Sequence, residues 1–243
     1  MGGLLIGFAF LMAALAAASR AHASSAPASA AHPSASIEKI VSSGDPRKML
    51  AASEAASKAG DRPLSDKLAI KAADANVMAK GAVFPSPFPS VPAAAWTAFV
   101  RALKGSNPRE ITSANHLGLF AFGMPRLVDV GIAENPKKVT KGGRSVWDAD
   151  WIAPASLETF LGSPSFQYHV FVKACRQDLE QILAKLPHAV GTEIDGKPAT
   201  PSGLLAVTKQ AGLKGLESWI ADEEVRKKHS NTTAAFHRLN GIF

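Results

Sequence analysis

The sequence contains a single cysteine among its 243 residues. One cysteine cannot form an intramolecular disulfide, so an exported protein of this sequence would depend on its apolar core for stability. Cys175 lies at helical spacing from Phe171, which is typical of a buried, small apolar residue. No CxxC or HExxH motif is present and the seven histidines are scattered, so we expect no metal site and no cofactor.

The charged residues give a net charge of +7 but form no basic stripe. Lysine and arginine are not interleaved with aromatic residues, which argues against nucleic acid as a partner. A diffuse positive surplus suits an anionic polymer, and it also serves solubility alone. The hydrophobic content of 47% is ordinary for a chain that folds around a core.

The apolar run over residues 4–18 is too short for a comfortable membrane span. Small residues at Ala21 and Ala23 follow it, as a signal peptidase requires, so residues 1–23 are predicted to be a secretory signal. The chain would then be exported to the periplasm or the extracellular space. An uncleaved N-terminal anchor is the alternative, because no basic residue precedes the run, and it would be the only contact with a membrane. Residues 24–36, rich in Ser, Ala and Pro, are predicted to be a flexible tether.

Residues 37–83 show two helical stretches. Asp45 is the expected N-cap of the first and Ser65 that of the second. Their apolar faces are thin and rich in alanine: Met49, Ala52 and Ala56 in the first stretch, and Leu68, Ala72, Ala75 and Met78 in the second. We predict a helical hairpin that docks on the main domain or on a partner. Residues 84–92 hold four prolines and predict a stiff, extended connector at a domain boundary.

Residues 93–243 are predicted to form one mostly α domain with little strand signal. Apolar spacing indicates helices that begin near Ser156, near Ser165 and at Ser202, and an earlier helix with a stripe of Trp96, Phe99, Val100 and Leu103. The intervening loops are rich in Gly, Pro and Trp. The basic segment 135–144 is expected to be a solvated loop.

Residues 102–123, ALKGSNPREITSANHLGLFAFG, resemble the lysozyme-like domains of soluble lytic transglycosylases and phage virion muramidases. That group reads approximately E-S-x-G-N-P, then Asn-Ser, then G-x-x-Q-F-G. Asn107, Ser113 and Gly118 fall on matching positions without a gap. Residues 156–171 resemble the group's Leu-x-x-Phe-Leu-x-x-Pro-x-x-Gln segment, and residues 202–220 its final Gly-bearing helix. The resemblance covers about residues 91–243 and implies a lysozyme-like fold that acts on, or binds, peptidoglycan.

Two residues depart from the group's pattern in this register. Leu103 stands where the resemblance implies the catalytic Glu, and Ala121 stands where it implies the Gln of G-x-x-Q. Glycosidic cleavage needs a carboxylic acid to protonate the leaving oxygen, which a leucine cannot do. Leu103 also completes an apolar helix stripe, so packing explains it equally well.

A different carboxyl group could take over the role of the acid. Glu110 is the nearest, in the loop that follows, although an exposed loop Glu is more often solvated or paired with Arg109. Asp148 and Asp150 lie within the tryptophan-bearing segment, between Trp147 and Trp151, and are the next candidates. No G-x-S-x-G motif supports a nucleophilic serine.

The glycan-binding surface could survive without the acid. Aromatic rings at Phe120, Trp147, Trp151 and Tyr168 are of the kind that stack on sugars, and Asn107 and Ser113 could hydrogen-bond a glycan. Gly118 and Ala121 would border the same surface. The basic segment 135–144, if it is not simply a solvated loop, could meet the carboxylates of peptide stems. Aromatic residues in a small helical domain are more often core, and we expect this for Phe122 and Trp96.

Three functions follow from these observations. The first is a non-catalytic lysozyme-like protein of the cell envelope or a phage particle, with peptidoglycan or an envelope or virion protein as partner. The second is a divergent muramidase or lytic transglycosylase with a relocated acid. The third abandons the resemblance and makes the chain an α-helical interaction protein of the envelope.

Overall fold

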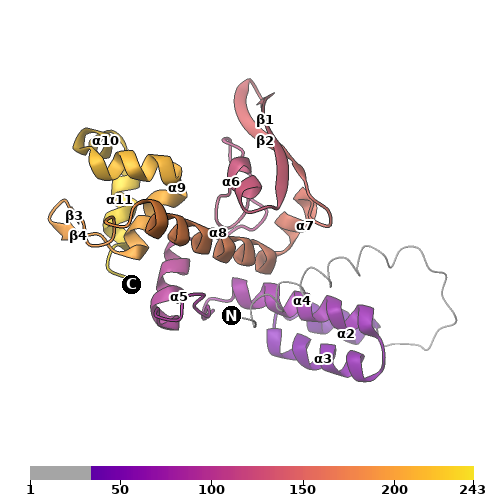
Figure 1. The fold of residues 1–243 in the computed structure, drawn as a ribbon. Helices are drawn as coiled ribbons and strands as arrows, with labels where there is room; N and C mark the ends of the chain where they lie inside the picture. The colour runs from indigo at the N-terminus through magenta and orange to yellow at the C-terminus, as the bar shows by residue number, and fades with distance from the viewer. Residues whose placement is uncertain (1–33) are drawn as a thin grey trace. The chain divides into compact units, whose positions relative to one another are not determined.

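The computed structural model describes residues 34–243 (Figure 1). Within this range the chain forms ten helices and two antiparallel two-stranded sheets, so the predicted mostly α fold is confirmed. The predicted signal or anchor over residues 1–23, and most of the tether over residues 24–36, lie outside the described residues. None of the described helices has the length and apolar character needed to cross a membrane.

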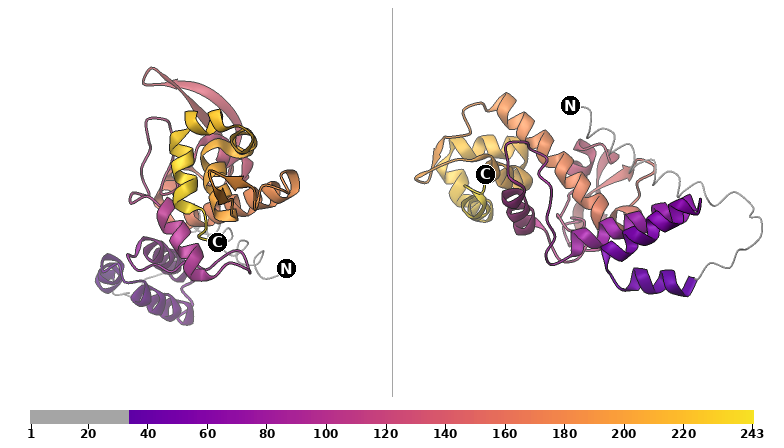
Figure 2. Two further views of the ribbon diagram at one scale, coloured as in Figure 1. Left: turned by 90° about the vertical axis from the view of Figure 1, so that its left-hand side faces the viewer. Right: turned by 90° about the horizontal axis from the view of Figure 1, so that it is seen from below.

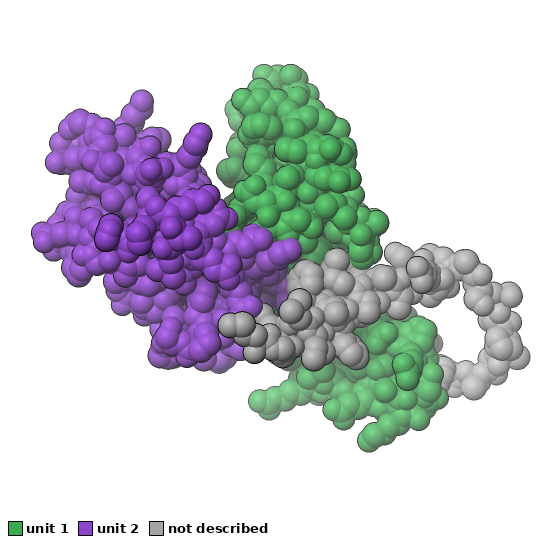
Figure 3. Space-filling model, in the orientation of Figure 1, with its two compact units in different colours: residues 1–80, 107–167 green, residues 81–106, 168–243 purple. Residues whose placement is uncertain are grey.

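The chain forms two compact units, which Figure 3 shows in different colours. Unit 1 combines the chain up to Lys80 with Asn107–Gln167, and unit 2 combines Gly81–Ser106 with Tyr168–Phe243. This arrangement departs from the predicted single domain over residues 93–243, because residues 107–167 group with the N-terminal helices. Helix α8 (Pro164–Lys185) provides its first residues to unit 1 and the remainder to unit 2.

Three helices begin unit 1: α2 (Ser34–Ser42), α3 (Pro46–Lys58) and α4 (Arg62–Met78). Because α2 starts at Ser34, the last residues of the predicted tether are helical. The predicted cap of α3 is confirmed, since the side chain of Asp45 accepts a hydrogen bond from a first-turn N–H.

The predicted cap of α4 is wrong. Ser65 lies inside the helix, and the N-cap is Asp61, whose Oδ1 accepts from the Leu64 N–H at 3.1 Å. Proline suits the first turn of a helix, where no N–H is needed, and Pro63 occupies that turn. Ser65 instead joins α3 to α4, because the Ser53 hydroxyl donates to its carbonyl oxygen at 2.8 Å.

The apolar faces of α3 and α4 are as thin as the sequence indicates. Met49 and Leu68 are buried, but the buried face of α4 reaches Val77 and leaves Met78, its last residue, exposed. So small a face buries little apolar surface, and a polar contact adds to it.

Asp74 of α4 provides that polar contact. It is buried, and its Oδ1 accepts from the Ser165 N–H at 3.0 Å, the Ser165 hydroxyl at 2.7 Å and the Ser163 hydroxyl at 2.9 Å. A carboxylate at this place caps the first turn of α8 and lies at the positive end of the helix dipole. The N-terminal helices are therefore docked on the rest of unit 1.

Two strands follow where loops are predicted. Residues 135–144 and the tryptophan-bearing segment belong to β1 (Ala133–Lys141) and β2 (Arg144–Trp151), an antiparallel ribbon. The turn between them is Gly142 and Gly143, both with positive φ, as a two-residue hairpin turn requires. The expectation of a solvated loop is corrected: the segment is exposed but paired.

Two short helices flank this ribbon in the sequence. The first is α6 (Met124–Asp129). The second, α7 (Leu157–Gly162), begins at the predicted Ser156, which forms a capping box with Thr159.

In unit 2, α5 (Ala93–Leu103) buries most of its predicted stripe. Trp96, Phe99 and Val100 are fully buried, whereas Leu103 is only half-buried at the helix end. The Phe99 ring lies edge-on to Phe243, with centroids 5.2 Å apart. This aromatic cluster forms the centre of the unit 2 core.

The predicted proline-rich connector, residues 84–92, packs on unit 2. The Phe84 N–H donates to the Thr97 hydroxyl at 2.9 Å, and the Tyr168 hydroxyl donates to the Pro85 carbonyl at 3.2 Å. Side chains of unit 2 thus hold the extended backbone of the connector in place.

The rest of unit 2 consists of β3 (Glu193–Ile194), β4 (Lys197–Pro198), α9 (Pro201–Ala221), α10 (Glu223–Lys228) and α11 (Ser230–Leu239). Helices α9, α10 and α11 pack together, as the views in Figure 2 show. The helix predicted from Ser202 is present but contains a kink at Gly212, where φ is 68°.

Candidate functional site

The loop over residues 107–123 carries the residues that resemble the lysozyme-like motif, and it is held by its own backbone. The Asn107 side chain accepts from the Arg109 N–H at 2.9 Å. The Gly118 N–H donates to the Glu110 carbonyl at 2.8 Å, and Leu117 forms a bridge with Phe122. The loop is therefore a folded turn with a defined shape.

Gln167 fastens this loop to α8. Its Oε1 accepts from the Leu119 N–H at 2.7 Å, while its Nε2 donates to the carbonyls of Pro108 at 2.9 Å and Phe160 at 2.8 Å. The side chain is fully buried, and its amide oxygen and both amide N–H groups hydrogen-bond to the loop and to α7. We call these contacts the Gln167 clamp.

Gly118 leaves room for the clamp. Its φ is 68°, which favours glycine, and a Cβ at this position would lie only 2.7 Å from Cδ of Gln167. Gly118, which is predicted to border the glycan-binding surface, is thus buried, and it shapes the loop.

Two of the predicted stacking rings belong to the core. Phe120 is 1% exposed and Tyr168 is 8% exposed, so neither ring presents a face to a ligand. The Tyr168 hydroxyl also accepts from Trp96 Nε1 at 3.0 Å, and burial raises its pKa to about 12. Their predicted glycan-stacking role is corrected, because a fully packed ring cannot stack on a sugar. The expected core positions of Phe122 and Trp96 are observed.

The two tryptophans of β2 remain accessible. Trp147 is 41% exposed, and Asn115 of the loop donates to its carbonyl at 2.7 Å, which ties the ribbon to the motif loop. Trp151 is half-buried and packs on Phe160 with ring centroids 5.5 Å apart. Of the predicted aromatic residues, these two alone offer partly exposed rings.

The candidate acids on β2 are engaged in ion pairs. Asp148 lies 3.1 Å from the Lys141 ammonium, and Asp150 lies 3.1 Å from the Lys137 ammonium. Burial alone would raise the pKa of Asp148, but hydrogen bonds from Lys141 and from a backbone N–H hold it below the ordinary value. The hydrogen bond from Lys137 likewise lowers the pKa of Asp150. A general acid needs a raised pKa, so neither carboxylate suits that role.

The remaining predicted residues are spread over both units. Asn107, Glu110, Ser113 and Ala121 are exposed on the motif loop in unit 1. Leu103, at the position of the family acid, is the last residue of α5 in unit 2. Within residues 34–243, no three His, Cys, Asp or Glu side chains gather as a metal site would require.

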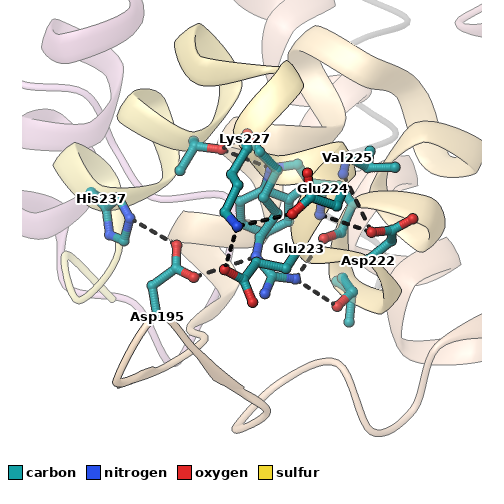
Figure 4. Close-up of polar contacts among 11 residues, drawn as sticks. Asp195, Asp222, Glu223, Glu224, Val225, Lys227 and His237 are labelled. Carbon is teal, nitrogen blue, oxygen red and sulfur yellow. Dashed lines mark hydrogen bonds and ion pairs between the residues drawn. The ribbon is translucent and has the colours of Figure 1, made fainter.

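A polar network that the sequence did not indicate lies in unit 2 (Figure 4). Asp195 lies 3.2 Å from His237 Nε2 and 3.4 Å from Arg226 Nε. Next to it, Lys227 pairs with Glu223 and Glu224 at 3.0 and 2.9 Å. These charges neutralise one another and join the β3–β4 turn to α10 and α11, so we assign them a structural role.

Comparisons with known proteins add no assignment, because no family model matches the chain and neither a curated protein nor a solved structure is significantly similar to it.

Proposed function

We propose that this chain is a non-catalytic, lysozyme-like protein, exported to the cell envelope or carried in a phage particle, that binds peptidoglycan. Two features support this role: the chain resembles the family over about residues 91–243, and Leu103 stands where the resemblance implies the catalytic Glu. It takes peptidoglycan as the partner because the accessible residues of unit 1 include aromatic, amide and hydroxyl groups of the kind that contact sugars.

The Gln167 clamp is the observation that carries the proposal. Residues 102–123 and residues 156–171 both resemble segments of the same family. A hydrogen bond joins them between Leu119 and Gln167, which lie 48 positions apart in the sequence. Two hydrogen bonds from the Gln167 side chain, to Leu119 and to Pro108, connect them, and a third, to Phe160, lies within the second segment. Such a contact supports a common origin for both segments, because either resemblance alone would be weak.

The state of the carboxyl groups supports the loss of catalysis. Leu103 cannot donate a proton, and the two aspartates on β2 are held ionised by lysines. General acid catalysis typically contributes about 10²- to 10⁴-fold to the rate, so its loss would slow glycosidic cleavage by a similar factor. Binding does not need a proton donor and can persist.

Co-sedimentation and clearing of purified peptidoglycan test the proposal together. We expect the full chain to sediment with insoluble peptidoglycan without clearing it. Activity in a Leu103→Glu variant, with none in a Leu103→Gln control, would support the assigned register. A chain that fails to sediment would refute the proposed function, and a native chain that clears the material would establish the enzyme instead.

A further inference from the structure

The two faces of the β1–β2 ribbon carry different sets of charged side chains. Cross-strand partners in an antiparallel pair point to the same side, and successive residues alternate. The register pairs Lys137 with Asp148 and Lys141 with Arg144, so these residues share one face with Asp150. On this face Lys137 and Lys141 are each neutralised by an aspartate at 3.1 Å.

The opposite face has a different composition. The register pairs Lys138 with Trp147 and Thr140 with Ser145, which places a cation, an indole and two hydroxyls together. None of these four residues is acidic. We call them the Trp147 face.

Lys138 on this face lacks the neutralisation that its neighbours have. Its ammonium lies 5.4 Å from the centroid of the Trp147 ring, and no ion pair to Lys138 occurs among residues 34–243. Trp147 is 41% exposed, although a tryptophan would ordinarily bury more of its surface. The result is a partly exposed aromatic ring with an ammonium over it that no carboxylate in the described part of the chain neutralises.

This arrangement fits a sugar that carries a carboxylate. The apolar C–H face of a sugar ring stacks on an indole, and a carboxylate beside the ring would pair with the ammonium. The hydroxyls of Thr140 and Ser145 can exchange hydrogen bonds with sugar hydroxyls. A neutral glycan would leave Lys138 unused, and an acidic protein surface would not need the ring.

We propose that the Trp147 face is a subsite for glycan strands of peptidoglycan, with Trp147 stacking on a sugar ring and Lys138 pairing with a carboxylate of the attached lactyl-peptide stem. This inference rests on the proposed function and specifies where the polymer is recognised. Exposed ion pairs are screened by salt, so binding weakens as ionic strength rises.

The test measures binding of the full chain to purified, protease-treated peptidoglycan sacculi. Trp147→Ala lowers the apparent affinity about tenfold, the loss expected when roughly half of the exposed indole area is covered by ligand. Lys138→Gln lowers it about threefold, as for an exposed ion pair. The matched control is Lys137→Gln, which removes the neighbouring cation on the other face and leaves the affinity unchanged.

Chemical amidation of the sacculus carboxyl groups supplies a second comparison. The native chain binds amidated sacculi about as weakly as the Lys138→Gln variant binds untreated ones, whereas amidation hardly changes the binding of that variant. Circular dichroism of each variant verifies the fold, so that a lost ligand contact is distinguished from unfolding.

Each outcome separates this inference from the proposed function. If the native chain binds and both variants bind equally well, or if Lys137→Gln is as harmful as Lys138→Gln, the Trp147 face is not the subsite although peptidoglycan binding stands. If binding is lost when the sacculi are treated with protease, the partner is a protein and the subsite is refuted. If the native chain does not bind at all, the proposed function fails as well.

Discussion

The Oε1 atom of Gln167 lies 2.7 Å from the backbone nitrogen of Leu119, so one side chain of α8 fixes the turn at Gly118. The same amide also donates to Pro108 and Phe160, and all of these contacts are within unit 1. The loop that resembles the family motif therefore depends on a residue far from it in the sequence.

Replacing this residue should destabilise unit 1. In Gln167→Ala, one N–H and two carbonyls lose their partners in a buried setting, and we expect a loss of about 3 kcal/mol in the free energy of unfolding. Chemical denaturation measures it. Gln177→Ala is the matched control on the same helix, because the Oε1 atom of Gln177 has no hydrogen-bond partner. Equal losses in the two variants would contradict the clamp.

The cap that Asp74 provides for α8 leads to a second prediction. Asp74→Ala removes three hydrogen bonds to Ser163 and Ser165, and should cost about 2 kcal/mol of stability. Limited proteolysis should then cut near α3 and α4 first, because these helices lose their polar attachment. The control is Asp66→Ala, an exposed position on α4. If Asp74→Ala unfolds no more readily than this control, apolar packing alone holds the helices.

The third prediction concerns the ionisation of Tyr168, which is simple to measure because the chain has no other tyrosine. Burial raises the pKa of Tyr168 to about 12, partly offset by the hydrogen bond from Trp96. Since the pKa of Tyr168 in the folded protein exceeds the ordinary value of 10.0, the stability linked to its protonation is complete below pH 10.0 and is lost as the pH rises towards 12. Tyrosinate absorbance should appear only near that pH. A midpoint close to 10.0 in folded protein would show that the phenol is exposed.

The fourth prediction concerns the aspartates of the ribbon, whose pKa values are lowered and not raised. The pKa of Asp148 is lowered below the ordinary value of 3.8, so the Lys141–Asp148 pair contributes stability above pH 3.8. This contribution is lost as the pH falls through the lower, folded value. In Lys141→Gln the carboxyl resonance of Asp148 should titrate at a higher pH than in the native chain. An unchanged titration would mean that the ion pair does not form in solution.

Local patterns predicted a large part of the helical fold. Apolar residues at helical spacing, such as Trp96, Phe99 and Val100, indicate where a helix faces the core. Asp45 is predicted as a cap, and Ser156 as the place near which a helix begins. These features depend on residues within one or two turns of each other, so the sequence alone contains the information.

Local sequence patterns did not predict the β1–β2 ribbon or the buried polar contacts. The nine residues of β1 are almost all exposed, so no apolar alternation marks the strand, and the pair Gly142–Gly143 was the one available signal. The contact between Asp74 and Ser165 spans 91 positions. A buried carboxylate or amide of this kind looks like an ordinary surface residue until the fold brings its partners together.

The central claim, binding of peptidoglycan without cleavage, is tested most directly by mass spectrometry of fragments released from purified sacculi during prolonged incubation with the native chain. Glu110→Gln, which removes the exposed carboxyl of the motif loop, is incubated in parallel. The account predicts that the native chain is recovered with the sacculi and that neither protein releases muropeptides. Muropeptides released by the native chain would contradict it, and their loss in Glu110→Gln would identify the relocated acid.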